Sequence, residues 1–175
     1  MRSEAAAVVL VCLASCGPHH LAAPEPMSTS TSLTIGPISY FQARCARCHG
    51  PYGSFFPDSF RATPPEVVAK KTDEMCRGQG GMALAGADLE AQIEYQRSIQ
   101  RGRVFVAVIS VDGGEMRGEV TPGAAVTLVG QERVPASVEG HLWHCVLPKG
   151  EVRVEASGEG VATLTGLKRS FMSAE

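Results

Sequence analysis

Apolar and polar residues follow two different repeats along the chain. Up to about residue 102, apolar positions recur every three or four residues, and Ile38, Phe41 and Cys45 are the first such set. That spacing places side chains on one face of an α-helix. Beyond it, a continuous apolar run at 104–111 is followed by segments in which apolar and polar residues alternate, as they do in strands. The pattern therefore predicts helices first and β-strands second.

Three helices are expected, at 38–49, from Pro65 onward, and at 86–99. Proline in the first turn with Glu66 behind it is typical of a helix start. A glycine-rich stretch then ends the second helix. These helices predict that the part at 35–102 is an all-α domain.

The part at 103–175 is expected to be a small all-β sandwich. Val152 and Val154 alternate with charged residues, and turns rich in glycine and proline separate the alternating segments. The stretch 118–160 resembles the carboxypeptidase-regulatory-like, transthyretin-like β-sandwich modules, most closely at 147–150. Such modules share no single activity, so this resemblance implies a fold only. The predicted fold class is therefore two domains, an all-α one followed by an all-β one.

One short run carries the chemistry predicted for the chain, namely Cys45-Ala46-Arg47-Cys48-His49. A C-x-x-C-H run is the attachment signature of c-type haem. Shuffling 6 Cys and 5 His within 175 residues gives roughly 0.006 such runs, so chance is a poor explanation. A zinc half-site normally needs a second Cys/His pair at close spacing, and a thioredoxin-like C-x-x-C needs a βαβ setting that the pattern lacks.

Around this motif the sequence resembles the cytochrome c family. The family begins with a short helix, carries an aromatic residue four positions before the first cysteine, here Phe41, and continues from the motif into glycine. The resemblance implies that Cys45 and Cys48 bind haem c covalently and that His49 is the proximal iron ligand. In this family the last helix crosses the first, so the resemblance also implies that Tyr95 meets Phe41.

The resemblance also implies a distal iron ligand. In small bacterial members a methionine follows a glycine-rich turn and precedes the last helix, and Met82 occupies that place. Met75 is the less favoured methionine because it lies within a helical pattern. A histidine, another group or an open distal site are the remaining alternatives. In the loop after the motif, the carbonyl of Pro51 or of Pro57 is expected to accept the hydrogen bond of the proximal histidine.

Residues 1–15 are expected to be a signal peptide of the lipoprotein type. Arg2 supplies the positive start, and the apolar run that follows is too short to span a bilayer. Leu13-Ala14-Ser15-Cys16 resembles the lipobox of bacterial lipoproteins, in which Cys16 would carry the lipid anchor; a plain signal peptide is the alternative. Residues 16–34 are rich in Pro, Ser and Thr and are expected to be a flexible tether. The chain is therefore expected in the bacterial periplasm or at the cell surface.

Two cysteines are left over once the signal peptide, the lipid anchor and the haem are assigned, Cys76 and Cys145. In an oxidising compartment two spare thiols suggest a disulfide. Two separate buried thiols are the alternative.

Composition and motifs together predict a function. A net charge of −2 without a basic stripe gives no sign of a nucleic-acid partner. The expected function is that of an exported, lipid-anchored c-type cytochrome that carries single electrons through one haem with His49 and Met82 as axial ligands. Its partners would be redox proteins in transient contact, and the membrane through Cys16. An electron carrier of this kind would have no catalytic residues.

Two other functions stay open. A haem enzyme or sensor would have an open or labile distal site and would bind carbon monoxide rapidly when reduced. A surface interaction protein would use the β-sandwich to bind a partner, with the haem in a secondary role.

Overall fold

The computed structural model describes residues 33–78, 82–158 and, for the backbone alone, 161–169. The expected signal peptide, the anchor residue Cys16 and the tether up to residue 32 lie outside the described residues. In these described ranges, no helix is long and apolar enough to cross a membrane.

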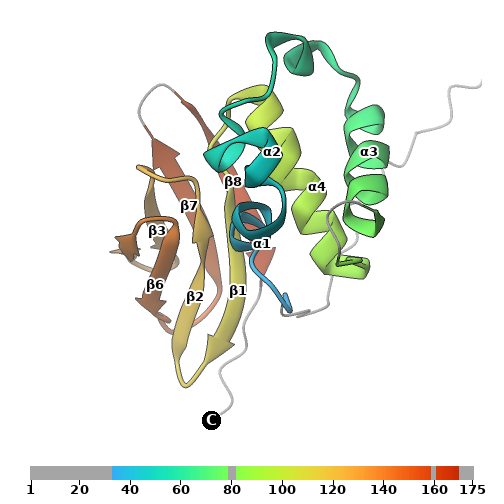
Figure 1. The fold of residues 1–175 in the computed structure, drawn as a ribbon. Coiled ribbons are helices and arrows are strands. Elements are labelled where there is room, and N and C mark those ends of the chain that lie inside the picture. Colours follow the sequence, from blue (N-terminus) through green and yellow to red (C-terminus); the bar gives the residue numbers. More distant parts are fainter. Residues whose placement is uncertain (1–32, 79–81, 159–160, 170–175) are drawn as a thin grey trace, which may run out of the picture.

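Helices form the first part of the described chain (Figure 1). They are α1 Pro37–Arg44, α2 Ala46–His49, η1 Pro51–Gly53, η2 Asp58–Ala62, α3 Pro65–Arg77 and α4 Gly86–Arg101, where η denotes a 3₁₀ helix. Helix α3 begins with proline at its first position, and α4 ends at Gly102, whose left-handed φ of 59° favours glycine. The predicted helix starts at 65 and 86 are confirmed, whereas the predicted first helix is broken in two at Cys45.

The rest of the described chain forms two four-stranded antiparallel sheets. The strands are β1 Val106–Asp112, β2 Glu115–Val120, β3 Ala125–Val129, β4 Arg133–Pro135, β5 Ser137–Glu139, β6 Leu142–Val146, β7 Val152–Gly158 and β8 Val161–Arg169. One sheet has the order β1-β2-β6-β5 and the other β4-β3-β7-β8. Trp143 of the first sheet and Leu128 and Val154 of the second belong to one buried core, so the two sheets face each other. The alternation of Val152 and Val154 with less buried residues is confirmed.

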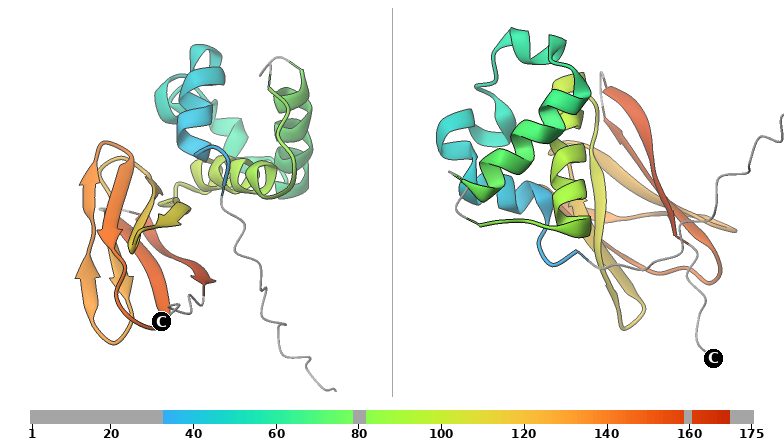
Figure 2. Two further views of the ribbon diagram at one scale, coloured as in Figure 1. Left: turned by 90° about the horizontal axis from the view of Figure 1, so that it is seen from below. Right: turned by 90° about the vertical axis from the view of Figure 1, so that its right-hand side faces the viewer.

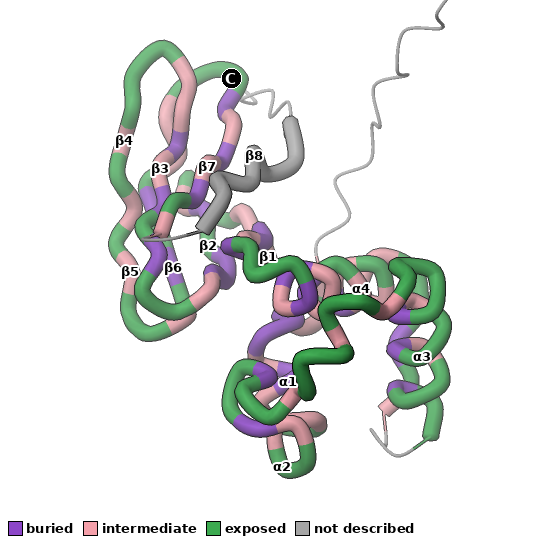
Figure 3. The backbone as a smooth tube through the Cα atoms, turned by 90° about the horizontal axis from the view of Figure 1, so that it is seen from above, coloured by how far each residue is buried: buried purple, intermediate pink, exposed green. Residues whose placement is uncertain are grey.

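Helix α4 is the centre of the helical part. Helices α1 and α3 both pack on it, α1 on the side of the sheets and α3 on the side away from them (Figures 1 and 2). Phe41 of α1 meets Tyr95 of α4 edge to face, with ring centroids 5.5 Å apart, as predicted. Helix α3 buries only one stripe, Val68, Thr72 and Cys76, and much of its remaining surface is exposed (Figure 3).

The predicted fold class, an all-α domain followed by an all-β sandwich, is wrong. The described part is a mixed structure with a β-rich C-terminal portion, and one of the cores of its helices is shared with the first sheet. Phe105 and Ala107, at the start of the first sheet, share one core with Ile38, Phe41 and Tyr95. Helix α1 has only 8 residues, and α4 covers one side of it, so its apolar face needs a second partner. The outer face of the sheet supplies that partner.

Candidate functional site

The first thiol of the C-x-x-C-H motif, Cys45, lies at the junction between α1 and α2, and the second, Cys48, lies in α2. The N–H of Cys45 donates to Phe41 O at 2.8 Å, and the N–H groups of Cys48 and His49 both donate to Cys45 O at 3.0 Å. The chain therefore makes one further turn at the motif. Cys45 is half-buried, Cys48 is exposed, and both are free thiols. The two cysteines therefore lie within one turn of backbone.

Gly50 ends the motif in a backbone conformation that favours glycine, with φ 74° and ψ 162°. A Cβ atom at this position would overlap the hydroxyl of Ser54 and approach Cγ of Phe55 to 2.7 Å. The N–H of Phe55 donates to His49 O at 2.9 Å and closes the turn. The glycine after the motif thus allows the loop to fold back against the histidine.

Aromatic rings surround His49. Phe56 stacks on the imidazole with centroids 4.6 Å apart and planes 23° apart. Phe60 stacks on Phe56 at 4.2 Å, and Phe41 lies 6.4 Å from the imidazole. The imidazole is therefore held against the loop by ring packing.

The proline carbonyl expected to accept a hydrogen bond from His49 is not distinguished by the contacts. Pro51 O accepts the N–H of Ser54 at 3.1 Å, and Pro57 O accepts the N–H of Phe60 at 2.8 Å. Each carbonyl keeps a second lone pair. The choice between Pro51 and Pro57 stays a prediction.

Met82 packs against the same hydrophobic cluster as the first motif cysteine. Both Met82 and Cys45 pack against one hydrophobic cluster whose buried members are Tyr40, Cys76 and Leu84. The Tyr40 hydroxyl donates to Met82 O at 2.8 Å, so α1 holds the backbone at the methionine. Two residues far apart in the sequence are thereby brought to one place.

The alternative methionine lies elsewhere. Met75 is in α3 with 36% of its surface exposed, and it is not part of the cluster that Cys45 and Met82 share. Val67, two turns earlier on the same helix, is also exposed, at 39%. Of the two methionines, Met82 is therefore the one that packs against the same cluster as Cys45.

The surroundings of Cys45 are apolar enough to change its acidity. Burial raises the pKa of the Cys45 thiol to about 11, and the nearby thiols of Cys76 and Cys48 add to the shift. Burial, followed by a hydrogen bond with Cys76, raises the pKa of the Tyr40 hydroxyl well above its ordinary range. Both groups are neutral near pH 7, as suits an apolar binding site.

Gln92 of α4 is a buried amide without a partner. Its side chain is 0% exposed, and neither its Nε2 nor its Oε1 has a hydrogen-bond partner among the described residues. One helical turn separates it from Leu89, which packs with Met82, and another from Tyr95, which packs with Phe41. Buried amides in proteins are nearly always hydrogen-bonded. Gln92 is therefore suited to bind a polar group of a ligand at this site.

The residues present fit a c-type haem. Within the ranges that the structure covers, no group of three or more His, Cys, Asp or Glu is placed to hold a bare metal ion. The site instead offers two thiols on one turn, an imidazole and a thioether, which are ligands that haem takes. Exposed apolar side chains near the motif, Tyr52 at 40% and Phe55 at 69%, are available to the apolar surface of a porphyrin.

The expected disulfide between Cys76 and Cys145 is not formed, and both residues are free thiols. Cys76 belongs to the cluster around Tyr40, whereas Cys145 belongs to the core between the sheets with Trp143. Two thiols in different cores cannot be joined without backbone movement. The alternative, two separate buried thiols, is what the structure contains.

A polar cluster that the sequence did not predict lies at the start of α1. Glu119 of β2 accepts the N–H of Ile38 at 2.6 Å and the N–H of Ser39 at 3.1 Å. The Ser39 hydroxyl also donates to this carboxylate, and its oxygen lies 3.1 Å from Nε2 of His141. We call Glu119, Ser39 and His141 the Glu119 cluster. A single acid in a strand carries no local signal of a partner in a distant helix, so sequence reasoning missed it.

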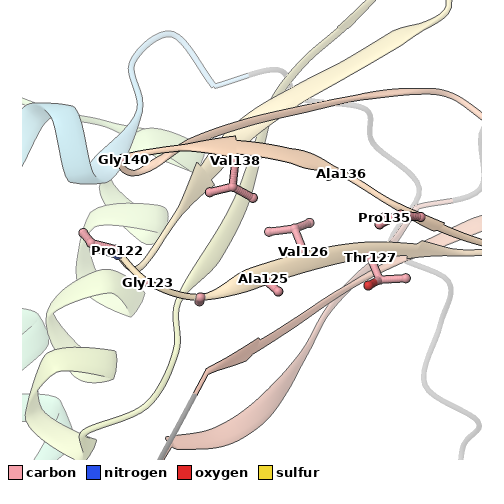
Figure 4. A pocket seen from close by; sticks show the side chains of 10 residues that line it. Pro122, Gly123, Ala125, Val126, Thr127, Pro135, Ala136, Val138 and Gly140 are labelled. Atoms are coloured by element: carbon pink, nitrogen blue, oxygen red, sulfur yellow. The ribbon is translucent and has the colours of Figure 1, made fainter.

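A pocket of about 590 Å³ lies away from the motif, at an edge of the sandwich between β3 and the strands β4 and β5 (Figure 4). Its walls are mostly small or apolar residues such as Pro122, Val126 and Val138, and none has an ionisable side chain. The pocket therefore lacks the groups that acid–base chemistry requires.

Comparison with known proteins finds no family model, no curated protein and no solved structure that matches this chain. The likeness to cytochromes c therefore depends on the motif and on its surroundings described above.

Proposed function

We propose that this protein is an exported c-type cytochrome that carries single electrons through one covalently bound haem. The observation that carries the proposal is the C-x-x-C-H motif whose first cysteine, Cys45, shares a hydrophobic cluster with Met82. The motif supports covalent attachment, and the shared cluster supports a thioether as the second axial ligand.

Each site residue has one task in this proposal. Cys45 and Cys48 would hold the haem through thioether bonds, which would prevent its dissociation. His49 and Met82 would bind its iron. The haem supplies a one-electron Fe(III)/Fe(II) couple. One electron comes from a reduced partner protein and passes to an oxidised one, so no catalytic residue is required.

Neighbouring side chains position these ligands. Phe56 stacks on His49 and limits rotation of its ring. Tyr40 fixes the backbone of Met82 through its hydroxyl. Gln92 offers a buried amide without a hydrogen-bond partner among the described residues. The supports come from α1, α4 and the loop after the motif, so a change in any of them reaches the ligands.

The partner surface is an exposed edge next to the motif. Cys48 is exposed, and Tyr52 and Phe55 expose 40% and 69% of their surfaces beside it. A small apolar rim of this kind suits a transient redox encounter, which typically buries little area.

Export and anchoring belong to the same proposal. Haem c is attached outside the bacterial cytoplasm, so a signal peptide at 1–15 and a lipid on Cys16 agree with the motif. Both lie outside the described residues. The anchor would keep the carrier at a membrane surface, within reach of membrane-bound redox partners.

Production of the full chain with bacterial haem-attachment machinery tests the proposal. We expect a pigment that stays with the polypeptide in denaturing acid and organic solvent, and a chain mass raised by one haem. The double variant Cys45→Ala/Cys48→Ala should lose the covalent pigment. The control Cys145→Ala removes a thiol from the sandwich core and should keep it. A wild-type chain without pigment, or with pigment that the solvent extracts, contradicts the proposal.

A further inference from the structure

The β-rich part supplies the N-terminal cap of the helix that leads into the motif. Helix α1 has Gly36 at its N-cap and no side-chain cap from its own segment. A Cβ atom on Gly36 would overlap the carboxyl group of Glu119, so the carboxylate stands where a capping side chain would stand. Free N–H groups at a helix start attract an anion, and Glu119 of β2 provides it.

The carboxylate carries a charge that water screens poorly. Its side chain is only 1% exposed. The donors around it are the N–H of Ile38 and the N–H and hydroxyl of Ser39. In the described part of the chain no lysine or arginine forms a salt bridge with Glu119; Nε2 of His141, whose side chain is 22% exposed, lies 3.7 Å from Oε1 of Glu119.

This charge lies near the proposed haem. Roughly 9 Å of helix separates Ser39 from Cys45, at ~1.5 Å per residue. Tyr95 already responds to the carboxylate, since burial, then Tyr52 and Glu119, raise the pKa of its hydroxyl. In a protein interior with an effective dielectric constant of ~20, a negative charge at such a range opposes the arrival of an electron.

We propose that Glu119 is a positioning residue that caps α1, the helix that leads into the motif, and, through its charge, lowers the reduction potential of the haem. This inference rests on the proposed function and assigns the β-rich part a role in it. The sheet both orients α1, which carries Phe41 and leads directly into Cys45, and places a fixed anion beside the cofactor. A residue of β2, 80 positions beyond Ser39, thus contributes to the reduction potential of the haem.

The midpoint potential of the haem-loaded full chain with Glu119→Gln tests the inference. Glutamine keeps a carbonyl acceptor for the N–H of Ile38 and removes the charge. In a redox titration that adds one electron per haem, we expect the equilibrium constant for reduction to rise roughly threefold to tenfold. At ~59 mV per tenfold, the potential rises by roughly 30 to 60 mV.

A matched control is available on the same sheet. Glu139 is exposed at the end of β5 and stands beside Leu142, which in turn stands beside Glu119 in the register. Glu139→Gln removes the same charge from a screened position, so its potential should stay within ~10 mV of the wild-type value. The midpoint potential of the haem is informative here because a loss of protein stability alone would not raise it.

The outcomes separate the two claims. A wild-type chain that holds no covalent haem contradicts the proposed function and, with it, this inference. A pigmented Glu119→Gln variant with an unchanged potential overturns the inference alone. If that variant does not accumulate, Gly36→Ala replaces it, because the added methyl group keeps every charge and forces the carboxylate out of its place. An upward shift in Gly36→Ala supports the inference, and a wild-type potential overturns it.

Discussion

At the scale of single residues, the apolar surroundings of Cys45 determine the acidity of its thiol. Cys45 packs against two apolar clusters, one with Phe41 and Tyr95 and one with Tyr40 and Met82. Its position between them explains why burial raises the pKa of this thiol to about 11. A cysteine and a methionine that pack against one apolar cluster, with an imidazole one turn further on, are the groups that the proposed function assigns to the haem.

Met82→Ala tests the distal ligand. We expect the variant to keep covalent haem, to lose the sulfur-to-iron charge-transfer band, and to have a lower reduction potential, because methionine ligation raises the potential. Absorption spectra of the oxidised and reduced protein measure this. Met75→Ala, on the exposed face of α3, is the control and should leave the spectrum unchanged. An unchanged spectrum in Met82→Ala would refute the assignment.

The thiol of Cys145 gives a prediction that depends on pH. Burial raises the pKa of this thiol, so the folded chain favours the neutral form. Its contribution to the free energy of unfolding is therefore complete below the unfolded pKa of about 8.5 and is lost as pH rises through the folded value. We expect iodoacetamide at pH 8.5 to label Cys145 more slowly in the folded chain than in urea, as peptide mass spectrometry would report. A cross-link between Cys76 and Cys145, or equal labelling rates, would contradict the prediction.

Elements with a local signal were predictable from the sequence. Pro65 marks the start of α3, a glycine ends α4, and the alternation at Val152 and Val154 marks β7. The motif likewise identifies Cys45, and a glycine-rich context favours Met82. Non-local features were not predictable, because a side chain such as Glu119 shows its partner only once the chain has folded. The error in fold class has the same origin, since the outer face of a strand carries no mark of the helix that covers it.

The turn after the motif predicts that alanine costs more stability at Gly50 than at Gly102. Gly50 has φ 74° and ψ 162°, and a Cβ atom there would overlap Ser54, whereas Gly102 has φ 59° and ψ 43° with open space around it. Gly50→Ala should lower the free energy of unfolding by about 2 to 3 kcal/mol. Gly102→Ala should cost about 1 kcal/mol. Urea unfolding of the haem-loaded chain measures both, and equal costs would show that the turn at Gly50 tolerates a side chain.

At the scale of the whole molecule, helices and sheets stabilise one another. Ile38 and Phe41 of α1 pack against Phe105 and Ala107 beside the first sheet, and the carboxylate of Glu119 caps the same helix. Neither contact is possible if the two parts separate. Unfolding of the sheets would therefore expose the apolar face of α1 and leave its first N–H groups without an acceptor.

Phe105→Ala tests this mutual dependence in the full chain. Phe105 is 6% exposed, so its truncation should cost about 3 to 5 kcal/mol, whereas Phe55→Ala, at a site 69% exposed, should cost less than about 1 kcal/mol. Trp143, the single tryptophan, reports on the sandwich core, and haem absorbance reports on the helices. Both probes should give one urea midpoint in the wild type and move together in Phe105→Ala. Two separate midpoints, or a shift of the haem signal alone, would mean that the helices unfold independently of the sheets.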